Sequence, residues 1–64
     1  MPRFRMDRRL RTRLQQLPLR ANLRSVRFCS EQDVIVEVET EDEARALNAA
    51  VALLRLEGRF QRIS

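Results

Sequence analysis

The chain contains no histidine, tryptophan, tyrosine or lysine, and it has a single cysteine and a single glycine. Histidine is the side chain that most often transfers protons near neutral pH, and a cysteine nucleophile depends on such a base. One cysteine cannot form an intramolecular disulfide, and without histidine it cannot complete the ligand set of a structural zinc site. These absences argue against an enzyme, a cofactor and a metal centre.

Long apolar runs are also missing from the sequence. No stretch of about 18 apolar residues predicts a transmembrane helix, and no apolar segment follows the N-terminal arginines as in a signal peptide. We therefore expect a soluble, cytoplasmic protein without a membrane partner. In that compartment Cys29 stays reduced, and on a predicted strand it is interpreted as a small, half-buried apolar residue.

The length limits how much core this protein can build. Its 64 residues make one small domain, 1–64. A chain of this size buries only about 60% of the surface that it exposes when unfolded. Apolar residues are 44% of the chain, which is enough for a globular core. Since disulfides and metals are excluded, oligomerisation is the remaining common source of extra stability.

Charge is distributed unevenly along the chain. All thirteen basic residues are arginines. GC-rich coding would explain this choice, but arginine also suits planar, bidentate contacts better than lysine does. Residues 1–27 carry nine arginines and one acid, whereas residues 28–64 carry four arginines and eight acids. Such a dipolar molecule can bind a polyanion through one half, or a second copy of itself.

The clearest structural signal is the stretch 34–58, which predicts a strand leading directly into a long helix. Valine occupies every second position from 34 to 38, which is the period of a strand. Thr40 is placed as an N-cap, and Glu43 three residues later completes a capping box. Acidic residues fill the first turn, where the helix dipole favours them. Gly58 is expected to be the left-handed residue that ends the helix.

The N-terminal segment predicts a second strand and helix. Arginine alternates with apolar residues over 2–6, which indicates a short strand. Asp7 is a candidate N-cap, within reach of Arg11. Leucines at helical spacing then predict a helix over 8–17, which Pro18 ends.

A hairpin is predicted from strands 24–30 and 34–38, joined by a polar turn. Period-2 alternation puts Val26 and Phe28 on one face of the first strand. A register in which paired positions sum to 64 places Phe28 opposite Val36, Val26 opposite Val38 and Arg27 opposite Glu37. This register brings the apolar residues together on one face.

A short edge strand over 59–63 completes the order β-α-β-β-α-β. Two split βαβ units of this kind predict an α+β, ferredoxin-like plait, with both helices on one face of a four-stranded antiparallel sheet. The first and last strands are expected to be short. An α-β-β-α domain with irregular ends is the alternative.

Residues 14–63 resemble heavy-metal-associated domains in the rhythm of their elements. The shared features are a leucine-rich first helix, V-x-V strands, an alanine-rich second helix, and Gly58 followed by Phe60. The resemblance implies the ferredoxin-like fold. The C-x-x-C motif of that family is absent, because residues 6–9 read Met-Asp-Arg-Arg, and metal carriage is not implied.

Arginines suggest one candidate functional surface. The arginines of the predicted first helix lie on its exposed sides, and those of the strands point to the open sheet face. Together they could follow the phosphates of a nucleic acid in a salt-dependent manner. The predicted polyanion-binding residues are Arg3, Arg5, Arg8, Arg9, Arg11, Arg13 and Arg27.

The long helix suggests a second surface. A helical projection directs Ala44, Leu47, Ala50, Val51 and Leu54 toward the sheet. A second apolar stripe on the far side has no partner within the domain, and exposed apolar surface often marks an interface. The function expected first is therefore a small, non-catalytic interaction or regulatory domain that forms a homodimer or docks on a larger protein, with nucleic-acid binding as the alternative. The predicted interface residues are Ala46, Ala49, Ala52, Leu53 and Leu56.

Overall fold

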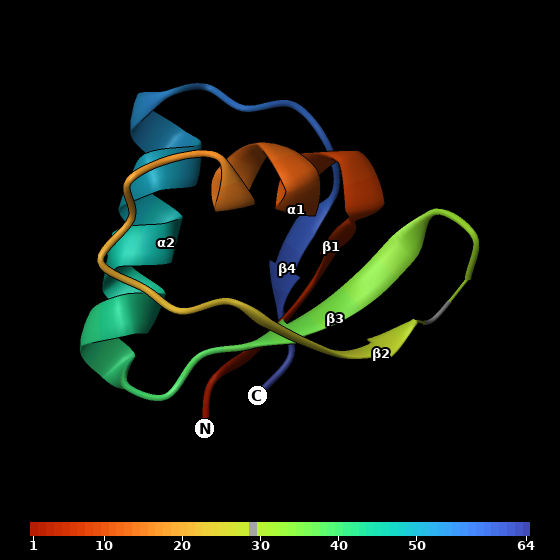
Figure 1. Ribbon diagram of the computed structural model, residues 1–64, viewed down its shortest axis with the longest axis horizontal. Coiled ribbons are helices and arrows are strands. Elements are labelled where there is room, and N and C mark those ends of the chain that lie inside the picture. Colours follow the sequence, from red (N-terminus) through yellow and green to blue (C-terminus); the bar gives the residue numbers. More distant parts are fainter. Residues whose placement is uncertain (29) are drawn as a thin grey trace.

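The computed structural model describes residues 1–28 and 30–64. Four strands pair antiparallel in one sheet, in the order β2-β3-β1-β4, and two helices accompany them (Figure 1). Both end segments are strands of this sheet, so the alternative with irregular ends is wrong. In chain order the elements are β1 (Arg3–Asp7), α1 (Arg8–Gln15), β2 (Arg24–Phe28), β3 (Asp33–Glu37), α2 (Glu41–Leu53) and β4 (Phe60–Arg62).

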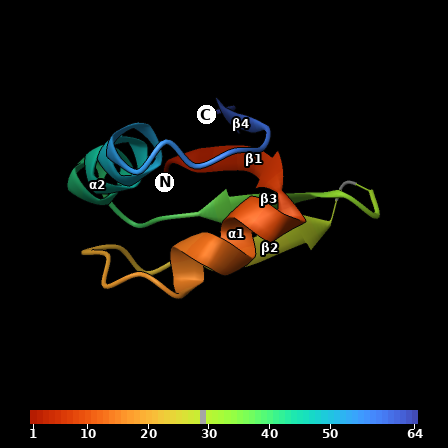
Figure 2. The same cartoon turned by 90° about the horizontal axis from the view of Figure 1, so that it is seen from above.

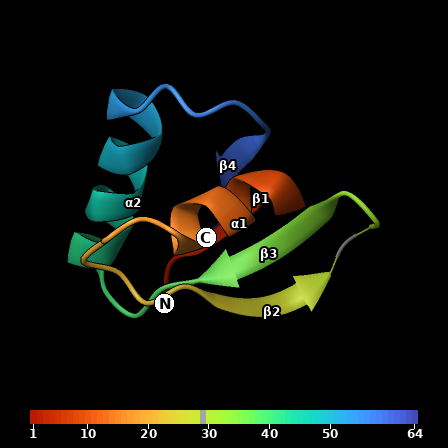
Figure 3. The same ribbon diagram turned by 45° about the horizontal axis from the view of Figure 1, so that its top comes forward.

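The two helices leave one face of the sheet open. In Figure 1 α1 lies above the strands and α2 rises from the left end of the sheet, while the lower face carries no helix. Seen from above, α1 crosses in front of β3 and β2 (Figure 2). The loop of the β2–β3 hairpin and α2 lie at opposite ends of the sheet (Figure 3).

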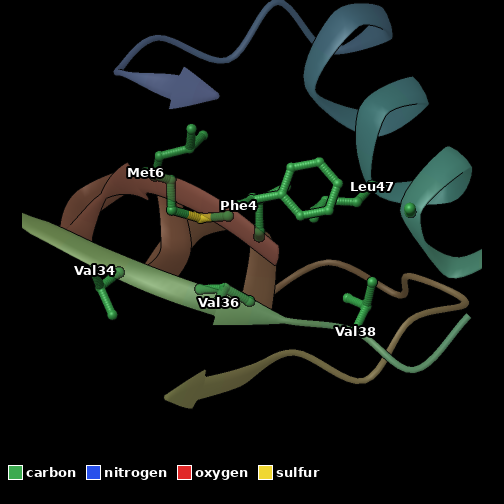
Figure 4. Close-up of a cluster of buried hydrophobic side chains, with 9 residues drawn as sticks. Phe4, Met6, Val34, Val36, Val38 and Leu47 are labelled. Carbon is green, nitrogen blue, oxygen red and sulfur yellow. The ribbon is translucent and has the colours of Figure 1, made fainter. Parts of the chain in front are cut away.

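The core lies between the helices and the covered face. Phe4 is paired with Val36, and Met6 with Val34, so the apolar residues of β1 and β3 share one face. The Phe4 ring points toward Leu47 of α2 (Figure 4) and stacks on the Phe60 ring, with centroids 5.1 Å apart. The fully buried apolar residues are Phe4, Met6, Leu10, Leu14, Val34, Val36, Val38, Ala44 and Leu47.

Both predicted N-caps are confirmed. The Asp7 carboxylate accepts a hydrogen bond from the backbone N–H of Arg9 at 2.8 Å. The Thr40 hydroxyl accepts one from the backbone N–H of Glu43 at 3.1 Å. The Glu43 carboxylate reaches back to the N–H of Glu39 at 2.9 Å, one residue before the cap. The bonds accepted by Asp7 and Thr40 satisfy donors that the first helical turn leaves unpaired.

The predicted hairpin register is wrong by two residues along β3. Phe28 pairs with Val34 instead of Val36, and Arg27 pairs with Ile35 instead of Glu37. The register shifts between Ser25 and Arg27, because a β-bulge adds a residue to β2. Val26, expected opposite Val38, lies at this bulge and is 45% exposed.

Helix α2 ends before the predicted stop. Its last residue is Leu53, and Arg55 two residues later has a left-handed φ of 49°. The N–H of Leu56 donates to the Val51 carbonyl at 3.2 Å, and the N–H of Arg55 donates to the Ala52 carbonyl at 3.3 Å. This pair of bonds is a Schellman motif with arginine at the position that usually holds glycine.

The early helix end exchanges the roles of two leucines. Leu54, expected in the core, is 52% exposed. Leu56, expected on the far side of the helix, is half-buried and packs against the core. Because the chain leaves the helix at Arg55, the helical projection no longer describes the residues that follow it.

Gly58 does not end α2, but glycine is required at this position for another reason. Its φ is 125°, and a Cβ added there would lie 3.3 Å from the Cβ atoms of both Asp7 and Leu10. The chain therefore passes close to the start of α1 where a side chain has little room. Gly58 allows this approach before Arg59 and β4.

We expect Arg55→Gly to stabilise the domain by about 0.5–1 kcal/mol. Glycine adopts a positive φ without the cost that an L side chain has there, although it adds some entropy to the unfolded chain. Urea unfolding followed by circular dichroism would measure the change. Arg45→Gly, at an exposed position inside α2, is the matched control and should destabilise by about 1 kcal/mol. If both glycine variants lost a similar amount of stability, the left-handed conformation assigned to Arg55 would be contradicted.

The side chain of Phe28 and the whole of Cys29 lie outside the described residues. The predicted inward orientation of Phe28 and the half-buried state of Cys29 therefore stay predictions. Among the described residues, neither helix has the length and apolar character needed to cross a bilayer.

Candidate anion-binding surfaces

The open face of the sheet carries arginines and carboxylates on neighbouring strands. Arg3 on β1 is paired with Glu37 on β3, and Arg5 with Ile35. Paired residues of an antiparallel sheet point to the same side. These side chains therefore lie on the face opposite the core.

Glu37 is held by two arginines from different strands. One carboxylate oxygen, Oε2, accepts from Nε of Arg3 at 2.9 Å, and the other, Oε1, accepts from Nη2 of Arg24 at 2.8 Å. Arg3 lies on β1 and Arg24 on β2, on either side of β3. The three side chains link the three strands across the open face.

Asp33 is held in the same way, four residues earlier on β3. Its Oδ2 accepts from Nε of Arg5 at 3.1 Å, and its Oδ1 accepts from Nε and Nη2 of Arg59 at 2.9 and 2.6 Å. Arg59 also lies 3.5 Å from the Asp7 carboxylate. Because β1 separates β3 from β4, the Arg59 side chain reaches across β1 to Asp33.

Burial of the two carboxylates shows how these arginines lie. Asp33 is 5% exposed and Glu37 is 6% exposed, although no helix covers their face of the sheet. The four arginine side chains around them are between 50% and 57% exposed. The arginine side chains therefore shield the carboxylates from solvent and remain about half exposed themselves.

The arginines also change the acidity of both carboxyl groups. Hydrogen bonds from Arg59, and then from Arg5, lower the pKa of Asp33, and partial burial opposes them. Hydrogen bonds from Arg3 and Arg24 lower the pKa of Glu37 against the same opposition. Folding therefore favours the charged form of each carboxyl group over its protonated form.

We expect this face to lose its contribution to stability in acid. Because both pKa values are lower in the folded chain, the contribution is complete above the ordinary values of 3.8 and 4.5, and it is lost as the pH falls through the folded values. Urea unfolding at several pH values below about 5 would measure the loss. Asp33→Asn combined with Glu37→Gln should flatten the pH dependence. An equally steep dependence in this variant would contradict the assignment.

Helix α1 carries a separate group of arginines on its solvent side. Arg8, Arg9 and Arg13 are exposed, and the helix contains no acidic residue. Arg11 is half-buried and donates from Nη1 to the Ser25 hydroxyl on β2 at 2.7 Å. None of the ion pairs found among the described residues includes Arg9, Arg11 or Arg13.

The positions of these arginines do not favour the helix itself. Arg8 and Arg9 are the first two residues of α1, where the helix dipole disfavours positive charge. Arg9 and Arg13 are four residues apart, a spacing at which like charges repel. Thus the arrangement spreads positive potential along α1, and the arginines of its first turn slightly weaken the isolated helix.

The structure divides the predicted polyanion-binding residues into two surfaces. Arg3 and Arg5 lie on the open sheet face, and Arg27 faces the same side as Ile35, its partner on β3. The arginines of α1 lie on the helical layer. Arg24 and Arg59 belong to the sheet group and were missed by the sequence analysis, because their role depends on carboxylates brought near by the sheet. The sheet group is Arg3, Arg5, Arg24, Arg27 and Arg59, and the helix group is Arg8, Arg9, Arg11 and Arg13.

A shallow cavity of about 450 Å³ lies at the β4 end of the open face. Arg5, Asp33, Arg59, Phe60 and Gln61 line it. Two guanidinium groups and one carboxylate thus share its wall. The cavity offers hydrogen-bond donors from both arginines and an amide from Gln61.

The outer side of α2 exposes a smaller apolar area than the projection predicted. Leu53 is 81% exposed, and Ala49 and Ala52 are exposed beside it. Ala46 is half-buried, and Leu56 packs against the core as described above. The remaining apolar surface is therefore concentrated at the C-terminal end of α2, where Leu54 extends it.

The described residues contain no group of three or more histidine, cysteine or carboxylate side chains placed to hold a metal ion. Comparison with protein-family models, with curated proteins and with solved structures finds no match for this chain.

Proposed function

We propose that this chain is a small binding domain that attaches to the phosphate backbone of a nucleic acid through the arginines of α1. The observation that carries the proposal is the group of four arginines within one eight-residue helix that has no acidic residue. A helix of this length is about 12 Å long, so the positive charge is dense. Arginine donates two parallel hydrogen bonds to a phosphate.

The cost of these positions to the helix supports a binding role. Arg9 opposes the helix dipole and repels Arg13, yet neither has an ion-pair partner among the described residues. A bound phosphate relieves both effects. In contrast, Arg3 and Arg5 of the sheet group are already paired with carboxylates.

Fluorescence anisotropy with labelled oligonucleotides at low and moderate salt tests the proposal. We expect tight binding at low salt, with an affinity that falls steeply as salt rises because bound phosphates release counterions. Arg9→Gln combined with Arg13→Gln should weaken binding and reduce the slope of log K against log salt by about two. This variant should be no less stable than the parent chain, so weaker binding would not reflect unfolding.

Arg45→Gln combined with Arg55→Gln is the matched control, because it removes the same charge from α2 and the turn that follows it. It should change binding less than the α1 variant does. Equal effects of the two variants would show that only net charge matters. An absence of binding at low salt would overturn the proposal.

A second candidate function is self-association through α2. Leu53 is 81% exposed and Leu54 is 52% exposed, side by side at the end of the helix. Adjacent exposed leucines, with the small Ala49 and Ala52 next to them, would let another helix approach closely. In this role the domain is a homodimer or docks on a larger protein.

Light scattering after size-exclusion chromatography tests self-association. We expect the mass of a dimer for the parent chain and of a monomer for Leu53→Glu. Arg45→Glu, on the polar side of the same helix, is the control and should keep the parent mass. A parent chain that is monomeric at high concentration would rule out a homodimer.

We also assign the fold to the ferredoxin-like plait. The order β-α-β-β-α-β supports this, as do the antiparallel sheet order β2-β3-β1-β4 and the free lower face in Figure 1. The resemblance to heavy-metal-associated domains concerns this architecture alone, since residues 6–9 hold no cysteine. Our proposal is therefore a plait without metal carriage.

A further inference from the structure

We propose that the open sheet face is a stacking platform for the bases of single-stranded nucleic acid, built from arginine in place of aromatic residues. This inference rests on the proposed function and specifies the class of nucleic acid. It would give the sheet group a role distinct from that of α1. The helix group would bind phosphates, and the sheet group would contact bases.

Ion pairs hold four of the five guanidinium groups of the sheet group in position. Arg3 and Arg24 are held by Glu37, and Arg5 and Arg59 by Asp33, with closest N–O distances between 2.6 and 3.1 Å. Both carboxylates are nearly inaccessible to solvent. A planar group that is already immobilised loses little further entropy when a ligand packs on it.

The arginines remain available to a ligand despite these ion pairs. Each of the four side chains is about half exposed. Each guanidinium has five N–H groups, and the carboxylates use only some of them. The flat side of the group stays suitable for stacking, because hydrogen bonds to a carboxylate lie in the guanidinium plane.

The dimensions of the platform fit several bases. Asp33 and Glu37 are four residues apart on β3, which separates the two arginine pairs by about 13 Å along the strand. Between them lies Ile35, which is half-buried and apolar. The cavity of about 450 Å³ at one end adds the Gln61 amide as a hydrogen-bonding group for a base edge.

Among the side chains that the structure describes, aromatic residues do not provide this platform. Phe4 and Phe60 stack on each other on the core side of the sheet, and the chain has no tyrosine or tryptophan. RNA-binding sheets commonly stack bases on aromatic rings, but guanidinium planes also serve. A duplex conceals its base faces, so a stacking platform selects a single strand.

The charge balance of the open face agrees with a stacking role. The sheet group puts five arginines on a face that also holds the carboxylates of Asp7, Asp33 and Glu37, which leaves a net charge of only +2 among these residues. This face therefore attracts phosphates less strongly than α1 does. The contribution of the open face to the affinity for nucleic acid should depend mainly on the bases and only weakly on the salt concentration.

Anisotropy with three labelled ligands tests the proposal on the unaltered chain. They are a short thymidine homopolymer, an abasic chain of the same length, and a duplex of matched phosphate number. We expect the thymidine strand to bind at least about tenfold more tightly than the abasic chain, because stacking acts only on bases. Equal affinity for the two, or a preference for the duplex, would overturn the platform and leave binding through α1 intact.

Substitutions that keep the charge test the residues. Arg5→Lys combined with Arg24→Lys removes two guanidinium planes, and should weaken thymidine binding about tenfold without changing the affinity for the abasic chain. Arg9→Lys combined with Arg13→Lys on α1 is the matched control and should have little effect on the preference for thymidine. Thermal unfolding verifies that both variants fold.

The outcomes separate the two proposals. A folded sheet variant that retains the full preference for thymidine would overturn the arginine platform. If the unaltered chain binds none of the three ligands at low salt, the proposed function itself fails. If the sheet variant does not fold, the comparison of thymidine with abasic ligand on the unaltered chain still decides the inference.

Discussion

Phe4→Ala is expected to remove roughly a third or more of the stability of this domain. The Phe4 side chain is fully buried, and it contacts both the sheet core and the Phe60 ring. Removing a buried phenylalanine typically costs about 3–5 kcal/mol. A domain of this size has a total stability of about 3–10 kcal/mol, at roughly 0.05–0.15 kcal/mol per residue. The loss is therefore comparable with the whole stability.

Urea unfolding followed by circular dichroism would measure this effect. Phe4→Leu keeps most of the apolar volume and should cost clearly less than Phe4→Ala. Val26→Ala, at the exposed bulge of β2, should change the free energy of unfolding by no more than about 0.5 kcal/mol. A folded Phe4→Ala variant with nearly unchanged stability would contradict the core assigned here.

Gly58→Ala should cause the second large loss, of about 1–3 kcal/mol. The new methyl group would meet the Cβ atoms of Asp7 and Leu10 at 3.3 Å, and the φ of 125° is one that alanine rarely adopts. Neither neighbour can move easily, since Leu10 is buried in the core and Asp7 caps α1. The strain therefore acts on the start of α1.

Thermal unfolding would measure the loss, with Glu57→Ala as the neighbouring control. Glu57 is exposed, so its replacement should change stability by no more than about 0.5 kcal/mol. Gly58→Ala should also loosen the cap of α1, which amide hydrogen exchange at Arg9 would report. If Gly58→Ala were as stable as the parent chain, the segment around residue 58 could move away from α1 at little cost in free energy.

Local rules explain the parts of the fold that the sequence predicted. Asp7 and Thr40 begin helices because their side chains accept from nearby backbone N–H groups, and both partners lie within three residues. The valines of β3 alternate because one face of the sheet is buried. Parity also placed Arg3 and Arg5 correctly on the open face, since side-chain direction along a strand follows from position alone.

The parts that failed depend on contacts between distant segments. A bulge such as that at Val26 is a property of two paired strands, so alternation within β2 could not reveal it. The end of α2 is decided by Leu56 packing against the core, which outweighs the cost of a positive φ at Arg55. Asp33 accepts hydrogen bonds from Arg59, which is 26 residues away in the sequence, because the strand order of the sheet brings the two side chains close together.

The bulge in β2 also has a consequence for how copies of this chain can assemble. β2 and β4 are the two edges of the sheet. An incoming strand needs a continuous row of backbone donors and acceptors, and the bulge at Val26 interrupts that row on β2. The other edge, β4, is only three residues long. Lateral growth of the sheet into a fibril is therefore disfavoured at both edges, and association in solution is directed to the side-chain surfaces instead.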